Sequence, residues 1–337
     1  MTISLRQTSG IQAYMALLAG VAALTLSPMF VHWAEAPGLV TSFYKMGLAA
    51  VVLTPLVLWH GRKRGWPARQ AFLFPIAAGF FSALDHGFWS TAIGKTTVAN
   101  ATLLNNISPL WVALFAVLIW REQPKKRFWL GLLAIFIGVS MVLGSTLLIR
   151  PAFAGGDTLA AFSSFFYAGF YLVTQKGRRW MNTLFYLWAF SLTGGTFLFI
   201  GTRLFGYAII GYSSFTYLNF VMAALIAQLG AYTFITFALG TLPASVVTPT
   251  MVLQPVLTAL IAIPFAGEQL LLAQAAGGGL TLAGVFLVNT SVVLRTQAVK
   301  GGLSGQIRKP TEARLDERAV INAQPVNRDD SSYSAEK

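Results

Sequence analysis

The chain has 337 residues, of which 55% are apolar and only 10% are charged, and its net charge is +13. Because soluble domains carry about 25% charged residues, this composition excludes an ordinary soluble domain and indicates a membrane protein. The chain has no cysteine and three scattered histidines, which excludes disulfides, thiol nucleophiles and thiolate metal sites, so we predict neither a metal nor a cofactor.

Ten apolar segments follow one another along the chain, each close to the roughly 20 residues that a membrane-spanning helix needs. Single Gly, Pro and Ser residues interrupt many of them, which membrane helices tolerate. The first segment is too long for the apolar region of a signal peptide, and no cleavage site is evident, so we expect it to be retained. The segments predict an all-α integral membrane fold, and the short connections between them predict one compact bundle of helices. The ten predicted transmembrane helices are 11–32, 39–59, 69–93, 97–120, 127–148, 158–175, 183–205, 215–239, 244–265 and 270–294.

The basic residues lie in short loops between these segments, which indicates membrane orientation rather than binding of nucleic acid. With the N-terminus in the cytoplasm, fourteen loop cations fall inside, and only Lys95, Arg150 and Arg203 fall outside. This bias predicts a multi-pass membrane protein with both termini in the cytoplasm, and we expect a bacterial inner (plasma) membrane.

One stretch, residues 88–142, occurs twice at an offset of 146 positions without a gap. Chance matches of Ala and Leu would not keep proline, glutamate and two glycines in one register, so this is an internal duplication. Each repeat holds five segments, and because five is odd, the second copy enters the membrane inverted. We predict repeats at 11–148 and 157–294 and a disordered cytoplasmic tail at 301–337. The matched residues include Pro109, Glu122, Gly131 and Gly138 with Pro255, Glu268, Gly277 and Gly284.

A proline inside the fourth helix of each repeat is followed thirteen residues later by a glutamate. This pattern, over residues 11–294, resembles the drug/metabolite transporter superfamily and within it the ten-helix EamA-type branch. The resemblance implies a basket of helices around a central cavity, and within this branch the chain looks like the amino-acid exporters of the YddG type. Inverted repeats of this kind place a substrate site at their interface near the middle of the bilayer.

Three titratable residues lie inside predicted helices, where charge is costly unless it meets a partner, water or a substrate. Lys45 either pairs with a neighbouring helix or attracts a substrate carboxylate. Asp85 and His86 point about 100° apart on a helix, so we expect that they do not both face one small ligand squarely. Asp85 shares a face with Trp89. A structural ion pair between Asp85 and Lys45 is the alternative to a substrate site.

Pro109 and Pro255 each free the carbonyl group four residues earlier, and we predict hinges at both. Amide side chains beside these carbonyls suit an ammonium or a hydroxyl group, although ordinary hydrogen bonds between helices are the alternative. The sixth and eighth helices add polar and aromatic residues at helical spacing, which either line the cavity or pack. The remaining candidates for the substrate site are therefore Asn105, Asn106, Ser163, Tyr167, Gln228, Tyr232 and Gln254.

One intramembrane cation and one mid-span carboxylate are what a zwitterion requires. We therefore predict a secondary transporter that exports small metabolites, foremost neutral or aromatic amino acids, by facilitated efflux or exchange. Small multidrug relatives in the superfamily resemble one another in having an acidic residue in the first helix, which is absent here and weakens a proton-coupled multidrug exporter. Export of a sugar, purine or cationic compound is the alternative; a channel, or an enzyme for which no nucleophile and base are evident, is less favoured. The expected partners are a small-molecule substrate and the lipid bilayer, with no nucleic acid, and we expect a functional monomer.

Overall fold

The structure is a computed structural model that describes residues 10–96, 101, 104–120, 124–147, 155–254, 256–257, 272–273 and 275–291. The chain divides into two compact units, Met1–Asn289 and Thr290–Lys337, and the contacts discussed below lie within the first. Several predictions fall outside the described residues, namely those on Glu122, Pro255, Glu268 and the tail 301–337.

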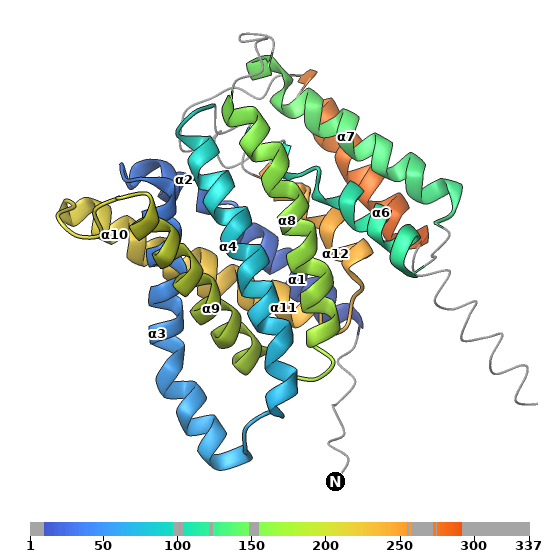
Figure 1. Cartoon of the computed structure of the whole chain (residues 1–337). Helices are drawn as coiled ribbons and strands as arrows, with labels where there is room; N and C mark the ends of the chain where they lie inside the picture. Colours follow the sequence, from blue (N-terminus) through green and yellow to red (C-terminus); the bar gives the residue numbers. More distant parts are fainter. Residues whose placement is uncertain are drawn as a thin grey trace, which may run out of the picture. The chain divides into compact units, whose positions relative to one another are not determined.

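The described elements are all helices (Figure 1), as the apolar segments predict. In the first half they are α1 (Gly10–Leu24), α2 (Ser27–Trp33), α3 (Gly38–Arg64), the short 3-10 helix η1 (Arg69–Phe72), α4 (Leu73–Ile93), α6 (Ser108–Trp120) and α7 (Lys126–Leu147). In the second half they are α8 (Gly155–Gly177), α9 (Thr183–Leu204), α10 (Ser214–Met222), the π-helix η2 (Ala223–Ala231), α11 (Tyr232–Ala238) and α12 (Ala244–Met251), followed by an apolar helix at Ala275–Ser291.

Five described segments are long and apolar enough to cross a bilayer. Large apolar side chains on them are exposed, among them Ile11, Val51, Leu73 and Leu204. Exposure on this scale is unfavourable in water but expected against lipid tails. The five segments are Gly10–Trp33, Gly38–Arg64, Arg69–Ile93, Thr183–Leu204 and Ser214–Ala238.

Three of the apolar segments are interrupted by turns next to a proline. The first breaks at Thr25–Leu26, just before Ser27 and Pro28, and so is not the continuous helix that the sequence predicts. The fourth breaks at Asn106–Ile107, just before Pro109, and the ninth turns at Val252. Proline lacks the N–H group that would bond the carbonyl four residues earlier, which weakens the helix there. Asn106 and Val252 are 146 positions apart, so the two repeats break at equivalent places.

The most extensive packing joins α3, α4, α8 and α9, while α1 packs against η2 and α11. A different contact joins α7 to the helix Ala275–Ser291. A Cβ atom on Gly131 would lie 2.8 Å from the carbonyl oxygen of Gly284, and one on Gly138 would lie 2.5 Å from that of Gly277. Gly131 and Gly138 correspond to Gly277 and Gly284 in the duplication, so the helices meet through equivalent residues in reversed order. Two copies related by a twofold axis make this kind of contact.

Candidate functional site

A small cavity lies in the core where α4 approaches α8 and α11, beside the break between α1 and α2. Its volume is about 30 Å³, counted as space for the centres of water-sized molecules, which is room for one or two waters. Most of the predicted site residues meet there. The lining residues are Leu24, Ser27, Asp85, His86, Trp89, Asn105, Tyr167, Tyr232 and Gln254.

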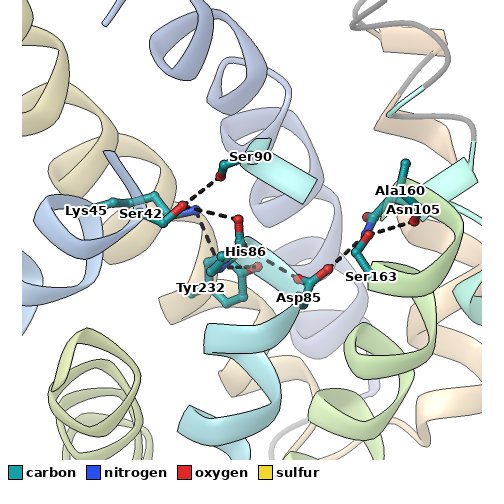
Figure 2. A network of polar contacts seen from close by, with 9 residues as sticks. All are labelled: Ser42, Lys45, Asp85, His86, Ser90, Asn105, Ala160, Ser163 and Tyr232. Carbon is teal, nitrogen blue, oxygen red and sulfur yellow. Dashed lines mark hydrogen bonds and ion pairs between the residues drawn. The ribbon is translucent and has the colours of Figure 1, made fainter. Parts of the chain in front are cut away.

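The Asp85 carboxylate is buried and held from one side (Figure 2). The amide nitrogen of Asn105 donates to Asp85 Oδ1 at 2.9 Å and to Ser163 Oγ at 2.8 Å. Ser163 in turn donates to the carbonyl oxygen of Ala160 at 2.7 Å. Asn105 therefore links the polar face of α8 to α4, and it fixes Asp85 with Oδ1 occupied.

His86 stands between the buried ammonium of Lys45 and the Asp85 carboxylate (Figure 2). Its Nε2 lies 3.4 Å from Lys45 Nζ, and its Nδ1 lies 3.5 Å from Asp85 Oδ2. The direct Lys45–Asp85 ion pair considered from the sequence is thus replaced by a three-residue chain. Asp85 and His86 both line the cavity, although adjacent residues of a helix point about 100° apart. The imidazole turns its Nδ1 edge back toward its neighbour's carboxylate, which offsets their separation around the helix.

The contact between His86 and Tyr232 identifies the centre of the duplication. The Tyr232 hydroxyl lies 3.4 Å from His86 Nε2, and the two rings pack edge to face with centroids 5.8 Å apart. These residues are 146 positions apart in the sequence, so they occupy equivalent places in the two repeats. Equivalent residues that touch lie at the axis that relates the copies. The cavity wall nevertheless differs between the repeats, because one contributes an imidazole and the other a phenol.

Aromatic rings make up much of the rest of the wall. Trp89 comes from α4, Tyr167 from α8 and Tyr232 from α11. Tyr167 packs on Tyr171 with centroids 4.5 Å apart. The Tyr171 hydroxyl is buried without a hydrogen-bond partner among the described residues. The wall thus joins an apolar, aromatic surface to a few polar groups, the composition that suits a small-molecule site.

The break in the first apolar segment also contributes to the wall. The carbonyl of Leu24 precedes Pro28 by four residues and accepts a hydrogen bond from Gln254 Nε2 at 3.2 Å. The sequence analysis applied this rule to Pro109 and Pro255 but not to Pro28, and it therefore missed Leu24 and Ser27. The signal was present in the sequence, since Pro28 interrupts an apolar run in the same way.

Four predicted residues do not line the cavity. Lys45 and Ser163 lie behind it and reach it through His86 and Asn105. Asn106 is buried in the turn before α6. Gln228 lies in η2 and donates to Ser191 Oγ at 3.1 Å, while its Oε1 has no partner among the described residues. Pro109, predicted as a hinge, is buried just after the Asn106–Ile107 turn.

Long apolar helices around a buried polar cavity define an integral membrane protein with the plan of a small-molecule carrier. The sequence matches the EamA-like transporter family twice, over residues 11–144 and 154–290. The chain therefore belongs to the EamA-like transporter family, of the drug/metabolite transporter superfamily, and is a multi-pass membrane transporter rather than an enzyme.

Relatives from two archaea support the same assignment. An uncharacterized transporter of Archaeoglobus fulgidus is 26% identical over 253 residues, which cover 73% of this chain and 86% of the relative. An uncharacterized transporter of Methanothermobacter thermautotrophicus is 25% identical over 202 residues, which cover 59% of this chain and 58% of the relative. One solved crystal structure superposes with a TM-score of 0.67 at 16% identity, over 84% of this chain and 98% of that chain, and so shares the fold.

Proposed function

We propose that this transporter exports small zwitterionic metabolites, foremost neutral or aromatic amino acids, as facilitated efflux or exchange. The two five-helix repeats, 11–148 and 157–294, have opposite orientations in the plasma membrane, with both chain termini in the cytoplasm. Transport proceeds by alternating access to the cavity at their interface.

The observation that carries this proposal is the asymmetric composition of the cavity wall. Among the described lining residues, Asp85 is the one carboxylate, and His86 stands beside it. Asp85 suits the ammonium group of an amino acid, and the positive charge of Lys45, 3.4 Å behind His86, suits its carboxylate. Trp89, Tyr167 and Tyr232 offer aromatic surface to the side chain. Lys45 lies behind His86 and acts on the substrate through it.

An amino acid needs more space than one or two water molecules, so the cavity must widen to accept it. The turns at Thr25–Leu26, Asn106–Ile107 and Val252 lie in the segments that supply its wall. Broken helices bend more readily than continuous ones. We therefore assign hinge roles to Pro109 and Pro255, which follow two of these turns.

Counterflow in proteoliposomes tests the substrate class. Vesicles loaded with an unlabelled neutral amino acid, such as methionine, threonine or an aromatic one, should take up labelled amino acid faster than empty vesicles. A sugar inside the vesicles should give no acceleration. Exchange of the sugar, with no amino-acid exchange, would contradict the proposal and leave the fold untouched.

A monovalent organic cation is the second candidate, and the same cavity wall favours it. A carboxylate among aromatic rings attracts cations electrostatically and through the ring faces. A cationic dye in the counterflow assay separates the two candidates. Dye exchange that depends on Asp85, with no amino-acid exchange, would make the protein a cation exporter.

A further inference from the structure

Lys45, His86 and Asp85 form a line of three titratable side chains that ends at the cavity (Figure 2). The geometry points to His86 as an internal proton relay, which passes one proton from Lys45 toward Asp85 when the cavity is empty and returns it when a substrate binds. This inference rests on the proposed transport of zwitterions. It adds how the empty transporter avoids carrying two buried charges through its conformational change.

The first step of the argument is the tautomer of His86. Its Nε2 faces Lys45 Nζ and the Tyr232 hydroxyl, each at 3.4 Å. An ammonium group has only donors, so Nε2 must accept from it, and the ring proton is then assigned to Nδ1. Nδ1 faces Asp85 Oδ2 at 3.5 Å. The ring therefore accepts on the side of the cation and donates on the side of the anion.

The transfer balances within the three residues. One Nζ–H bond of Lys45 breaks as the Nε2–H bond of His86 forms, and the Nδ1–H bond of His86 breaks as an Oδ2–H bond of Asp85 forms. The products are a neutral amine, the other imidazole tautomer and a carboxylic acid, and no proton enters or leaves. Both separations must shorten by a few tenths of an ångström to reach ordinary hydrogen-bond lengths. Asn105 holds Asp85 Oδ1, so Oδ2 is the oxygen that takes either the proton or the substrate ammonium.

The charge state then follows the occupancy of the cavity. Separated charges in a buried site are costly, so the empty site favours the neutral products. A zwitterion brings its ammonium to the Asp85 carboxylate and its carboxylate into the field of the Lys45 ammonium behind His86. Both substrate charges then favour the charged form and draw the proton back to Lys45. The loaded site is charged and the empty site neutral, with no proton taken from either side of the membrane.

Among the residues that the structure describes, the other titratable groups near Lys45, His86 and Asp85 are phenols. Tyr232 approaches from α11, and Tyr167 and Tyr171 approach from α8. Phenols keep their protons near neutral pH, so they do not compete as proton carriers. Tyr232 does offer a matched control, because its hydroxyl lies at the same distance from His86 Nε2 as the ammonium of Lys45 but is not needed for the relay.

Comparing exchange with net efflux in proteoliposomes tests the relay, because only net efflux requires the empty transporter to return. In His86→Gln the amide still donates and accepts hydrogen bonds but does not pass a proton. We expect its net efflux of a neutral amino acid to fall at least about tenfold more than its exchange, since a charged empty site raises the return barrier. Tyr232→Phe should keep the wild-type ratio. Equal losses of exchange and efflux in His86→Gln would make His86 a substrate ligand only and overturn the relay.

Two measurements on the wild type test the relay without relying on a variant. Net efflux should be slowed in D2O by a larger factor than exchange, because only net efflux includes the return of the neutralised empty site, and an imposed pH gradient should not drive amino-acid accumulation. Equal solvent effects on efflux and exchange, or accumulation driven by the gradient, would overturn the relay alone. A wild type that exchanges no amino acid would overturn the proposed function and this inference with it.

Discussion

Asp85 is buried and lines the cavity, with Oδ1 bound by Asn105 and Oδ2 at 3.5 Å from His86 Nδ1. A hydrogen bond to a charged group contributes about 1.5–3 kcal/mol. If Asp85 holds the substrate ammonium, Asp85→Asn should raise the amino-acid concentration for half-maximal counterflow by roughly 10–100-fold. Asp157→Asn is the control, because Asp157 is also buried but accepts from Thr96 at 2.6 Å and does not line the cavity. Equal effects of the two variants would contradict the assignment of Asp85 to the site.

Asn105 holds the Asp85 carboxylate in place by donating a hydrogen bond to it, so we expect its replacement to lower stability. Asn105→Ala removes a donor from a buried carboxylate, and an unsatisfied buried group of this kind costs about 1–3 kcal/mol or more. We expect a lower midpoint of thermal unfolding in detergent. Ser163→Ala removes only a neutral acceptor of the same amide and should lower the midpoint less. A larger loss in Ser163→Ala would show that the Ala160–Ser163 turn, not Asp85, depends on this network.

The sequence indicated which side chains form the site, but not which of them reach the cavity and which lie behind it. Charged and amide residues inside apolar segments identified Asp85, His86 and Asn105 as candidates, because a charge inside the bilayer needs a partner or a ligand. Which side chain reaches the cavity depends on rotamers and on packing between α3 and α4. The sequence therefore did not reveal that His86 separates Lys45 from the cavity.

At the scale of elements, apolar length was sufficient to predict where helices occur, and proline explained most of their breaks. The π-helix η2 (Ala223–Ala231) is different. Its sequence has no proline and continues the apolar pattern of α10, so the local sequence does not predict a π-helix there. A π-turn arises where packing favours a wider turn, and it often marks a functional position. Here it places Gln228 one turn before Tyr232, which lines the cavity.

The glycine contact between α7 and the helix Ala275–Ser291 gives a prediction at this scale. In Gly138→Ala the new methyl group would meet the backbone of Gly277 at 2.5 Å, so the helices must separate. We expect a loss of about 1–3 kcal/mol in stability, seen as a lower unfolding midpoint. Gly201→Ala in α9 is the control, because its nearest neighbour would be Leu39 Cδ2 at 3.7 Å, and alanine favours a helix by roughly 0.5–1 kcal/mol over glycine. Similar midpoints for both variants would show that α7 and this helix are not tightly packed in the membrane.

At the scale of the whole molecule, the 146-residue offset predicted two related halves but not what lies between them. The structure adds the contact of His86 with Tyr232 and the reversed contacts of Gly131 and Gly138. Such contacts depend on how the two repeats pack against each other. The sequence offset shows that the repeats are related, but it does not show which of their residues touch.

Gln175 and Arg178, at the end of α8, bind two other helices of the second repeat, and we call this pair of residues the clamp. Arg178 donates from Nε to the Thr236 carbonyl at 2.9 Å, and Gln175 Oε1 accepts from the Ala244 backbone N–H at 2.9 Å. Burial lowers the pKa of Arg178 to about 10, so it remains charged at neutral pH. The clamp ties the end of α8 to α11 and to the first residue of α12. Because α8 and α11 both supply the cavity wall, we expect the clamp to open when substrate passes that end.

A cross-link across this clamp is a direct test, and the chain has no cysteine to interfere. The variant Gln175→Cys/Ala244→Cys, joined by a short thiol-specific reagent, should lose most of its efflux while the untreated variant keeps it, since the cross-link prevents the end of α8 from leaving the start of α12. The matched pair Thr96→Cys/Asp157→Cys joins the turn directly after α4 to the start of α8, where the Thr96 hydroxyl donates to the Asp157 carboxylate. These two helices pack along their length and should move as one, so this cross-link should leave efflux nearly unchanged. Efflux at the wild-type rate through the cross-linked clamp would mean that the other end of the cavity, or a different pair of helices, controls access.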